Sequence, residues 1–260
     1  MSRYDPSNDI NQALGKVSGV ELFAKWGRNS VISTATTPED IWDGGGLYTG
    51  FNTILGAGGA EKMTIVSDDA ADAAAGTGAR TVEVSNLLDD DGNRMPNKIV
   101  TLNGTTPVEI DATQTYARAL RIKVLTSGSN GANEGNLTLA HATTGANIFA
   151  VMPIGENQTL VGAYTVPVGY CLLIDKFYVS ANISSGGAQN ATGRLLVRPF
   201  GEVFQNKLPI EVSANKDFNP IGDSYFYKVD AKADIKLNVK TVSSNNTIMT
   251  GAFGGVLVKV

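Results

Sequence analysis

The sequence predicts an all-β protein: an antiparallel β-sandwich of jelly-roll-like type, built as one large or two small modules and preceded by an extended N-terminal arm. Strand-like runs recur at intervals of about ten residues, the spacing expected of sandwiches and barrels. Gly is frequent, at 29 of 260 residues, and only 18% of the residues are charged. This composition favours short strands and many turns over long amphipathic helices.

Residues 1–45 differ from the rest because they are polar, carry several Gly and Pro residues and show neither a 2.0 nor a 3.6 period. We interpret them as an extended arm attached to a body at residues 46–260. The arm holds too much apolar material for a solvated tail. We therefore predict an interface, on this protein or a neighbour, for the apolar side chains Val17, Val20, Leu22, Phe23, Trp26, Ile41 and Trp42. The alternative is that Trp42 and Tyr48 pack into the body's own core, which would make the arm part of the fold.

Thirteen runs in the body have the composition of strands. They are Lys62–Ser67, Arg80–Ser85, Lys98–Leu102, Ala117–Leu125, Asn136–His141, Asn147–Val151, Gln158–Val166, Tyr170–Ser180, Gly193–Phe200, Lys207–Val212, Ser224–Val229, Asp234–Val242 and Thr250–Val260. The clearest alternation is at residues 234–240, where Ile235, Leu237 and Val239 share one face and polar residues share the other. This pattern predicts one buried and one solvated face, as in antiparallel sheets.

Turn residues such as Asp91-Gly92-Asn93 and Asn103-Gly104 separate these runs. The alanines of Asp68–Ala75 favour a helical turn. A weak boundary near residues 128–135 could divide two β modules, although the same glycines would also suit a long loop in one sandwich.

Few residues could carry catalysis. His141 is the only histidine and ends an alternating run, so we interpret it as a strand-end residue. Cys171 is the only cysteine and lies in an apolar run, which predicts a buried, unreactive thiol. One histidine and one cysteine exclude the usual zinc ligand set within one chain. We expect no enzyme activity and no cofactor.

A calcium-loop-like motif and two pairs of carboxylates are candidate sites. Asp89, Asp91 and Asn93 have the alternate spacing that begins a calcium loop, but Val100 stands where the bidentate Glu belongs, so we predict a hairpin tip and no metal. The pairs Asp68/Asp69 and Glu39/Asp40 could serve a glycosidase only if they faced each other across a cleft, and we interpret them as exposed loop acids.

The composition also restricts partners and location. The formal charge is −4 and basic residues are not clustered, so we expect no nucleic-acid partner. No apolar stretch approaches the ~20 residues of a membrane span. The N-terminus lacks a basic segment followed by an apolar core, which indicates a protein made and assembled in a cytosol.

Three strings carry a resemblance to a known family. They are residues 14–20 (LGKVSGV), residues 26–29 (WGRN) and residues 37–48 (TPEDIWDGGGLY), with further similarity through residue 175. This part of the chain resembles uncharacterised virion proteins of tailed bacteriophages, many of them marine. The loop at residues 88–96 departs from the form expected of that family.

The resemblance implies a structural protein of the virion and no catalytic motif. We expect a capsid decoration, cement or head-fibre-base protein on the capsid surface, assembled in the host cytoplasm as a homotrimer and bound to the major capsid protein or other virion proteins. A tail or neck component, or a receptor- or glycan-binding module of a fibre, is the alternative.

Overall fold

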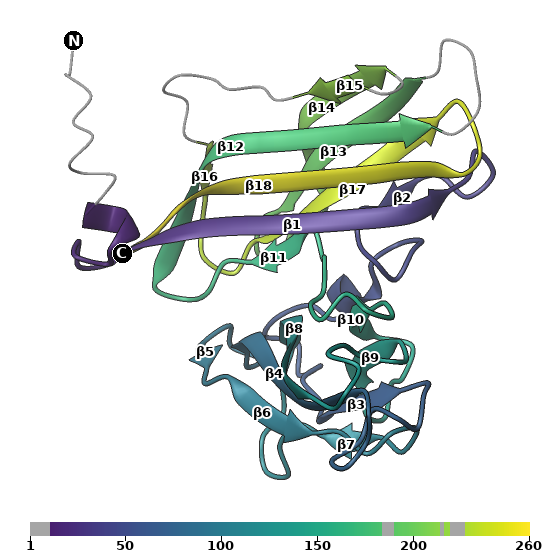
Figure 1. Ribbon diagram of the computed structural model, residues 1–260. Coiled ribbons are helices and arrows are strands. Elements are labelled where there is room, and N and C mark those ends of the chain that lie inside the picture. Colours follow the sequence, from purple (N-terminus) through teal and green to yellow (C-terminus); the bar gives the residue numbers. More distant parts are fainter. Residues whose placement is uncertain (1–10, 184–189, 214–215, 219–226) are drawn as a thin grey trace.

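The computed structural model describes residues 11–183, 190–213, 216–218 and 227–260. The strands pair antiparallel and fall into four sheets, two of longer strands in the upper part of Figure 1 and two of shorter strands in the lower part. The short 3-10 helix η1 (Thr49–Phe51) follows the first two strands.

The first upper sheet has the strand order β1, β18, β12, β15, with β16 also paired to β12. Its strands are β1 (Val20–Ile32), β18 (Thr247–Lys259), β12 (Tyr170–Ile183), β15 (Lys216–Phe218) and β16 (Tyr227–Val229). The second upper sheet has the order β11, β17, β13, β14, with β2 paired to β17. Its strands are β11 (Ala163–Thr165), β17 (Asp234–Val242), β13 (Asn190–Arg198), β14 (Gln205–Ser213) and β2 (Glu39–Asp40).

The lower part is formed by one continuous stretch of chain. One sheet has the order β10 (Ile148–Met152), β9 (Leu137–His141), β3 (Met63–Ser67), β7 (Val108–Glu109). The other has β4 (Ala79–Leu88) beside β5 (Arg94–Met95), β6 (Lys98–Thr101) and β8 (Arg118–Ser127). The chain leaves the upper part after β2 and returns to it with β11, so the lower part is an insertion.

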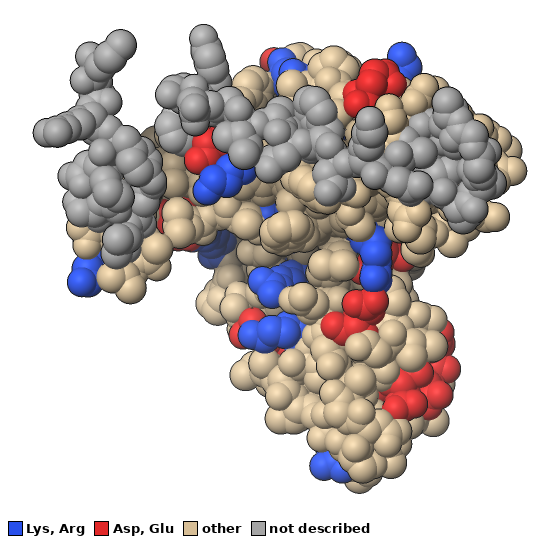
Figure 2. All heavy atoms as spheres, turned by 45° about the horizontal axis from the view of Figure 1, so that its top comes forward, with Lys and Arg blue, Asp and Glu red and all other residues tan. Residues whose placement is uncertain are grey.

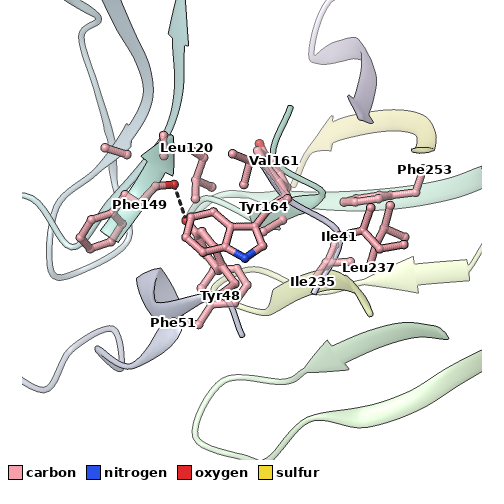
Figure 3. Packing of buried hydrophobic residues seen from close by; sticks show 14 of the residues in the cluster. Ile41, Tyr48, Phe51, Leu120, Phe149, Val161, Tyr164, Ile235, Leu237 and Phe253 are labelled. Carbon is pink, nitrogen blue, oxygen red and sulfur yellow. Dashed lines mark hydrogen bonds between the residues drawn. The ribbon is translucent and has the colours of Figure 1, made fainter. Parts of the chain in front are cut away.

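The two upper sheets face each other. The ring centroids of Phe23 on β1 and Tyr164 on β11 are 4.4 Å apart. A Cβ added to Gly251 on β18 would lie 3.0 Å from Leu237 Cδ1 on β17, because the facing strands approach closely there. Figure 3 shows Ile41, Ile235, Leu237 and Phe253 packed together between these sheets.

One apolar cluster connects all four sheets, with members such as Val179, Leu237, Leu139 and Val84. The all-β, antiparallel class is therefore confirmed. The finer expectation of a jelly-roll-like sandwich is not clearly met, because the strands lie as four sheets in a propeller-like ring. Gly92, at positive φ, lies in the tight turn that joins β4 to its partner β5.

The predicted arm is largely a strand of the body. β1 pairs with β18 from Val20 to Ile32, with one register shift near its end, and β2 pairs with β17. The boundary placed at residue 45 is thus wrong for residues 20–45, because β1 alternates too irregularly to be recognised without its partner strand. The boundary considered near residues 128–135 lies inside the lower part, between β8 and β9.

Most of the other strand predictions agree with the structure to within a few residues, and Asp234–Val242 coincides with β17. Ser224–Val229 lies partly outside the described residues. Residues 68–75 form turns and a bridge between Ala73 and Asn103, not the expected helical turn.

Candidate interaction surface and basic pocket

The seven predicted interface residues do not form one surface. Leu22 and Trp26 are 57% and 58% exposed, whereas Ile41 and Trp42 are only 1% and 3% exposed. Val17, Val20 and Phe23 are half-buried. The interface set is therefore corrected: Ile41 and Trp42 belong to the core, and Leu22 and Trp26 remain available.

Trp42 is held in the core by its own neighbourhood. Its ring meets Tyr48 edge-on with centroids 5.1 Å apart, and its Nε1 donates to the Gly46 carbonyl at 3.2 Å. The Tyr48 hydroxyl donates to the Phe149 carbonyl at 2.9 Å, a bond drawn in Figure 3. Burial raises the pKa of the Tyr48 hydroxyl, which stays protonated. Through Tyr48, these contacts connect Trp42 of the predicted arm to the lower part of the molecule.

An apolar groove runs along the outer face of the first upper sheet. Side chains alternate across a strand, so Leu22, Ala24 and Trp26 share one face of β1. In the central strand β18 the residues opposite Trp26 and Ala24 are Ala252 and Gly254. Small residues in the middle strand, between larger ones on its neighbours, leave a hollow.

The far wall of the groove comes from β12, where Tyr178 lies opposite Ala252 and Lys176 opposite Gly254. The groove encloses about 550 Å³, and Lys176 is its one charged lining residue among those described. Trp26 and Tyr178 thus stand on either side of Ala252.

A second hollow lies at the edge of β1, where the upper sheet meets β8 and the loop before β11. It encloses about 300 Å³ and is lined by Ala24, Lys25, Trp26, Gly27, Arg121, Gln158, Thr159, Leu160 and Thr250. Trp26 therefore borders both hollows. We call this second hollow the basic pocket, because its two charged lining residues in the described chain are Lys25 and Arg121.

Lys25 is buried and its Nζ donates to the Leu120 carbonyl at 2.7 Å. Within the described residues no carboxylate pairs with it. Burial, and then the positive charge of Arg121, lower the pKa of Lys25 to about 7. The protonated Lys25 ammonium thus has a carbonyl contact but no carboxylate to neutralise its charge within the described residues.

The wall opposite Lys25 is fixed by hydrogen bonds. Thr159 accepts from the backbone N–H of Ile122 at 3.1 Å through its hydroxyl, and the Thr159 N–H donates to the Ile122 carbonyl at 3.1 Å. Arg121 Nη2 donates to Gln158 Oε1 at 3.2 Å. The Arg121 guanidinium is thus oriented by Gln158.

On the face shown in Figure 2, basic side chains occur where the wide upper part meets the narrower lower part, and acidic ones gather on one side of the lower part.

The polar face of β17 is buried, contrary to the expectation that it is solvated. Lys236 Nζ lies 2.7 Å from Asp40 Oδ2, and Asn238 Nδ2 donates to Asp40 Oδ1 at 2.7 Å. Asp234 accepts from Arg118 and Arg198, with shortest separations of 3.2 and 2.6 Å. These groups can be buried because each charge has a partner of opposite sign.

The same network changes the interpretation of two acids. Glu39 and Asp40, expected on an exposed loop, are 3% and 2% exposed in β2. Glu39 accepts from Asn29 Nδ2 at 2.9 Å, and Asp40 is held as above. Both carboxylates are thus engaged in structural contacts.

The remaining candidate residues also have structural contacts. His141 is buried, its Nε2 lies 3.0 Å from the Tyr116 carbonyl, and burial lowers its pKa. Asp89 accepts from the backbone and side-chain amides of Asn93 at 2.8 and 3.0 Å. Asp68 accepts from the backbone and side chain of Asn136. Cys171 is buried, as expected.

In the described part of the chain, no group of three or more His, Cys, Asp or Glu residues is placed to hold a metal ion. No helix found there is long and apolar enough to cross a membrane. Comparison with protein-family models, curated proteins and solved structures found no match to this chain.

Sequence reasoning missed Lys25, Arg121 and Tyr178. Lys25 and Arg121 are separated by a long stretch of chain and come together only when β1 docks beside β8. Leu22 and Trp26, the exposed members of the predicted interface set, could be recognised from the sequence as apolar residues in a polar segment.

Proposed function

We propose that the protein is a non-enzymatic structural component of a tailed-phage virion, a capsid decoration, cement or head-fibre-base protein that acts as a homotrimer on the major capsid protein. The resemblance of residues 14–175 to phage virion proteins supports the virion assignment. The apolar groove supports an assembly role, and it is the observation that carries the proposal.

The groove has the character of a protein interface. Leu22 and Trp26 expose more than half of their surface beside a hollow floored by Ala252 and Gly254. Contiguous exposed apolar surface of this kind marks sites of association, and buried aromatic anchors carry much of the energy of interfaces. Lys176 is the one charge that a partner must accommodate among the described lining residues.

We assign the groove to a second copy of this chain. A surface protein of an icosahedral shell is present in many copies, and closed rotational symmetry reuses one contact in every subunit. A trimer matches the local three-fold positions of such a shell.

The oligomeric state tests this assignment. Size-exclusion chromatography with light scattering should give three times the 27.3 kDa chain mass. Leu22→Asp should shift the protein towards the monomer, because it places a charge in the apolar contact. Ile99→Asp is the control, since Ile99 is 69% exposed on β6 and lies outside the groove. A wild-type monomer at micromolar concentration contradicts the proposal.

The position in the particle needs a separate test. Virions labelled with an antibody against this protein should carry the label on their heads in electron micrographs. Label confined to necks or tails would favour the tail or neck alternative.

A further inference from the structure

The basic pocket contains positive charge that the described protein does not neutralise. The other buried cations have carboxylate partners: Arg118 pairs with Asp234 and Lys236 with Asp40. Lys25 has a backbone carbonyl as its hydrogen-bond partner, and the charge that acts on it is the like charge of Arg121. Arg28, the next charged residue along β1, pairs with Glu156 of the loop between β10 and β11 at 2.8 Å. An external anion would supply the negative charge that Lys25 lacks among the described residues.

The other residues that line the basic pocket indicate what kind of molecule carries the anionic group. Trp26 also borders the apolar groove that we assign to a second copy, so its ring is not counted as part of this site. The Oε1 of Gln158 accepts a hydrogen bond from Arg121, and the side-chain amide N–H groups of Gln158 can donate to a ligand. A volume of about 300 Å³ is at the small end of ligand pockets. A ring-sized ligand with an anionic group and hydroxyls matches these features.

We propose that the basic pocket binds a carboxylate-bearing sugar unit, of the uronic or sialic acid class, with Arg121 and Lys25 on the carboxylate and Gln158 on a hydroxyl. Guanidinium and carboxylate make strong charge-assisted hydrogen bonds. The site goes beyond the proposed assembly function, because it would let a particle-bound protein attach to acidic glycans.

Binding is tested on the purified full-length protein with methyl β-glucuronide and N-acetylneuraminic acid as probes, by calorimetry and by tryptophan fluorescence. We expect a Kd on the order of 1 mM, as for a weak single-sugar contact. Methyl β-glucoside tests the requirement for the carboxylate, and sodium acetate tests the requirement for the sugar. Neutral sugar binding as tightly as the glucuronide, acetate binding as tightly, or the absence of binding by both acidic probes would each overturn the proposal.

Variants assign the binding to this pocket. Arg121→Gln and Lys25→Met should each weaken binding of the glucuronide by about tenfold or more, the loss expected for one charge-assisted hydrogen bond. Lys62→Gln is the charge-matched control, since Lys62 pairs with Glu109 at 2.9 Å in the lower part of the molecule. Arg121 is exposed, so its variant tests the site even if Lys25→Met fails to fold. Unchanged affinity in Arg121→Gln would place the ligand elsewhere.

The pH dependence gives a second signature. The carboxylate should bind the protonated form of Lys25, so affinity should fall as pH rises above about 7. Arg121 is the charged group that acts on Lys25 in the described structure. The fall should vanish in Lys25→Met, and a wild-type affinity that does not change between pH 6 and pH 9 would contradict the assignment of Lys25. These variants leave Leu22 unchanged, so failure here is distinguishable from failure of the trimer.

Discussion

Among the buried cations that the structure describes, Lys25 is the one without a carboxylate partner. Its Nζ is solvated by one carbonyl, while burial favours the neutral amine. A site with this property is a candidate for function, because a group kept under such strain is easily titrated or neutralised by a ligand.

The strain on Lys25 should appear in stability measurements. Its folded pKa of about 7 lies below the ordinary lysine value of 10.5. The unfolded chain therefore binds the extra proton between these values, and the destabilisation is full below pH 7 and disappears as pH rises to 10.5. Lys25→Met should thus raise the free energy of unfolding at pH 6 by on the order of a few kcal/mol, and by much less at pH 10. Thermal melts of both proteins at the two pH values check this, and an equal gain at both would contradict it.

Asp234 should be among the most sensitive positions in the core. It is the carboxylate shared by Arg118 and Arg198, and Arg118 is fully buried. Asp234→Ala leaves two guanidinium groups without that partner, so we expect a loss of about 3–5 kcal/mol. Urea denaturation measures it against Asp230→Ala, whose carboxylate is largely exposed and pairs with Lys228 at 2.6 Å. A loss below about 1 kcal/mol, typical of a surface pair, would contradict the role of Asp234.

At the scale of elements, β1 is the segment whose role changed most between sequence and structure. As an arm it would be dispensable for folding. As a strand it covers one edge of β18 and supplies Lys25, Trp26 and the buried Asn29. An uncovered β18 would expose a long row of unpaired backbone groups, which favours aggregation.

Truncation distinguishes these roles. Deleting residues 1–45 removes β1 and β2 together with Ile32, Ile41 and Trp42 from the core, so we expect an insoluble or unfolded product. Deleting residues 1–10 removes no described strand and should give a soluble protein. Circular dichroism and sedimentation of both products decide the matter, and a folded, soluble 46–260 body would restore the arm interpretation.

At the scale of the whole molecule, the inserted lower part is tied to the upper part at several points. Arg118 Nη2 on β8 donates to the Thr53 carbonyl at 2.8 Å and reaches Asp234 on β17. Lys25 on β1 reaches the Leu120 carbonyl on β8, and Tyr48 reaches Phe149. One apolar cluster continues through both parts.

This continuity should make unfolding a single transition. Because the two parts share core side chains and buried charges, neither is expected to unfold while the other stays intact. Differential scanning calorimetry should give one peak, with equal calorimetric and van't Hoff enthalpies for the unfolding unit. Two resolved peaks would show that the parts are independent domains.

Most strands of this protein were predictable because their signals are local. The alternation of Ile235, Leu237 and Val239 places them on one face of a strand, and turn residues such as Gly92 and Gly104 interrupt the runs. A single His and a single Cys likewise restricted the possible catalytic and zinc sites from the sequence alone.

The tertiary structure alone decided which faces are buried and which charges meet. Periodicity indicates that Lys236 and Asn238 share a face, but it cannot show that Asp40, far away in the chain, comes to lie against them. In the same way β1 is recognisable as a strand only beside β18, and Lys25 and Arg121 line one pocket only because Lys25 of β1 reaches β8. The physical reason is that the energy of a buried or clustered charge depends on its neighbours in space, and those neighbours are set by the arrangement of the sheets.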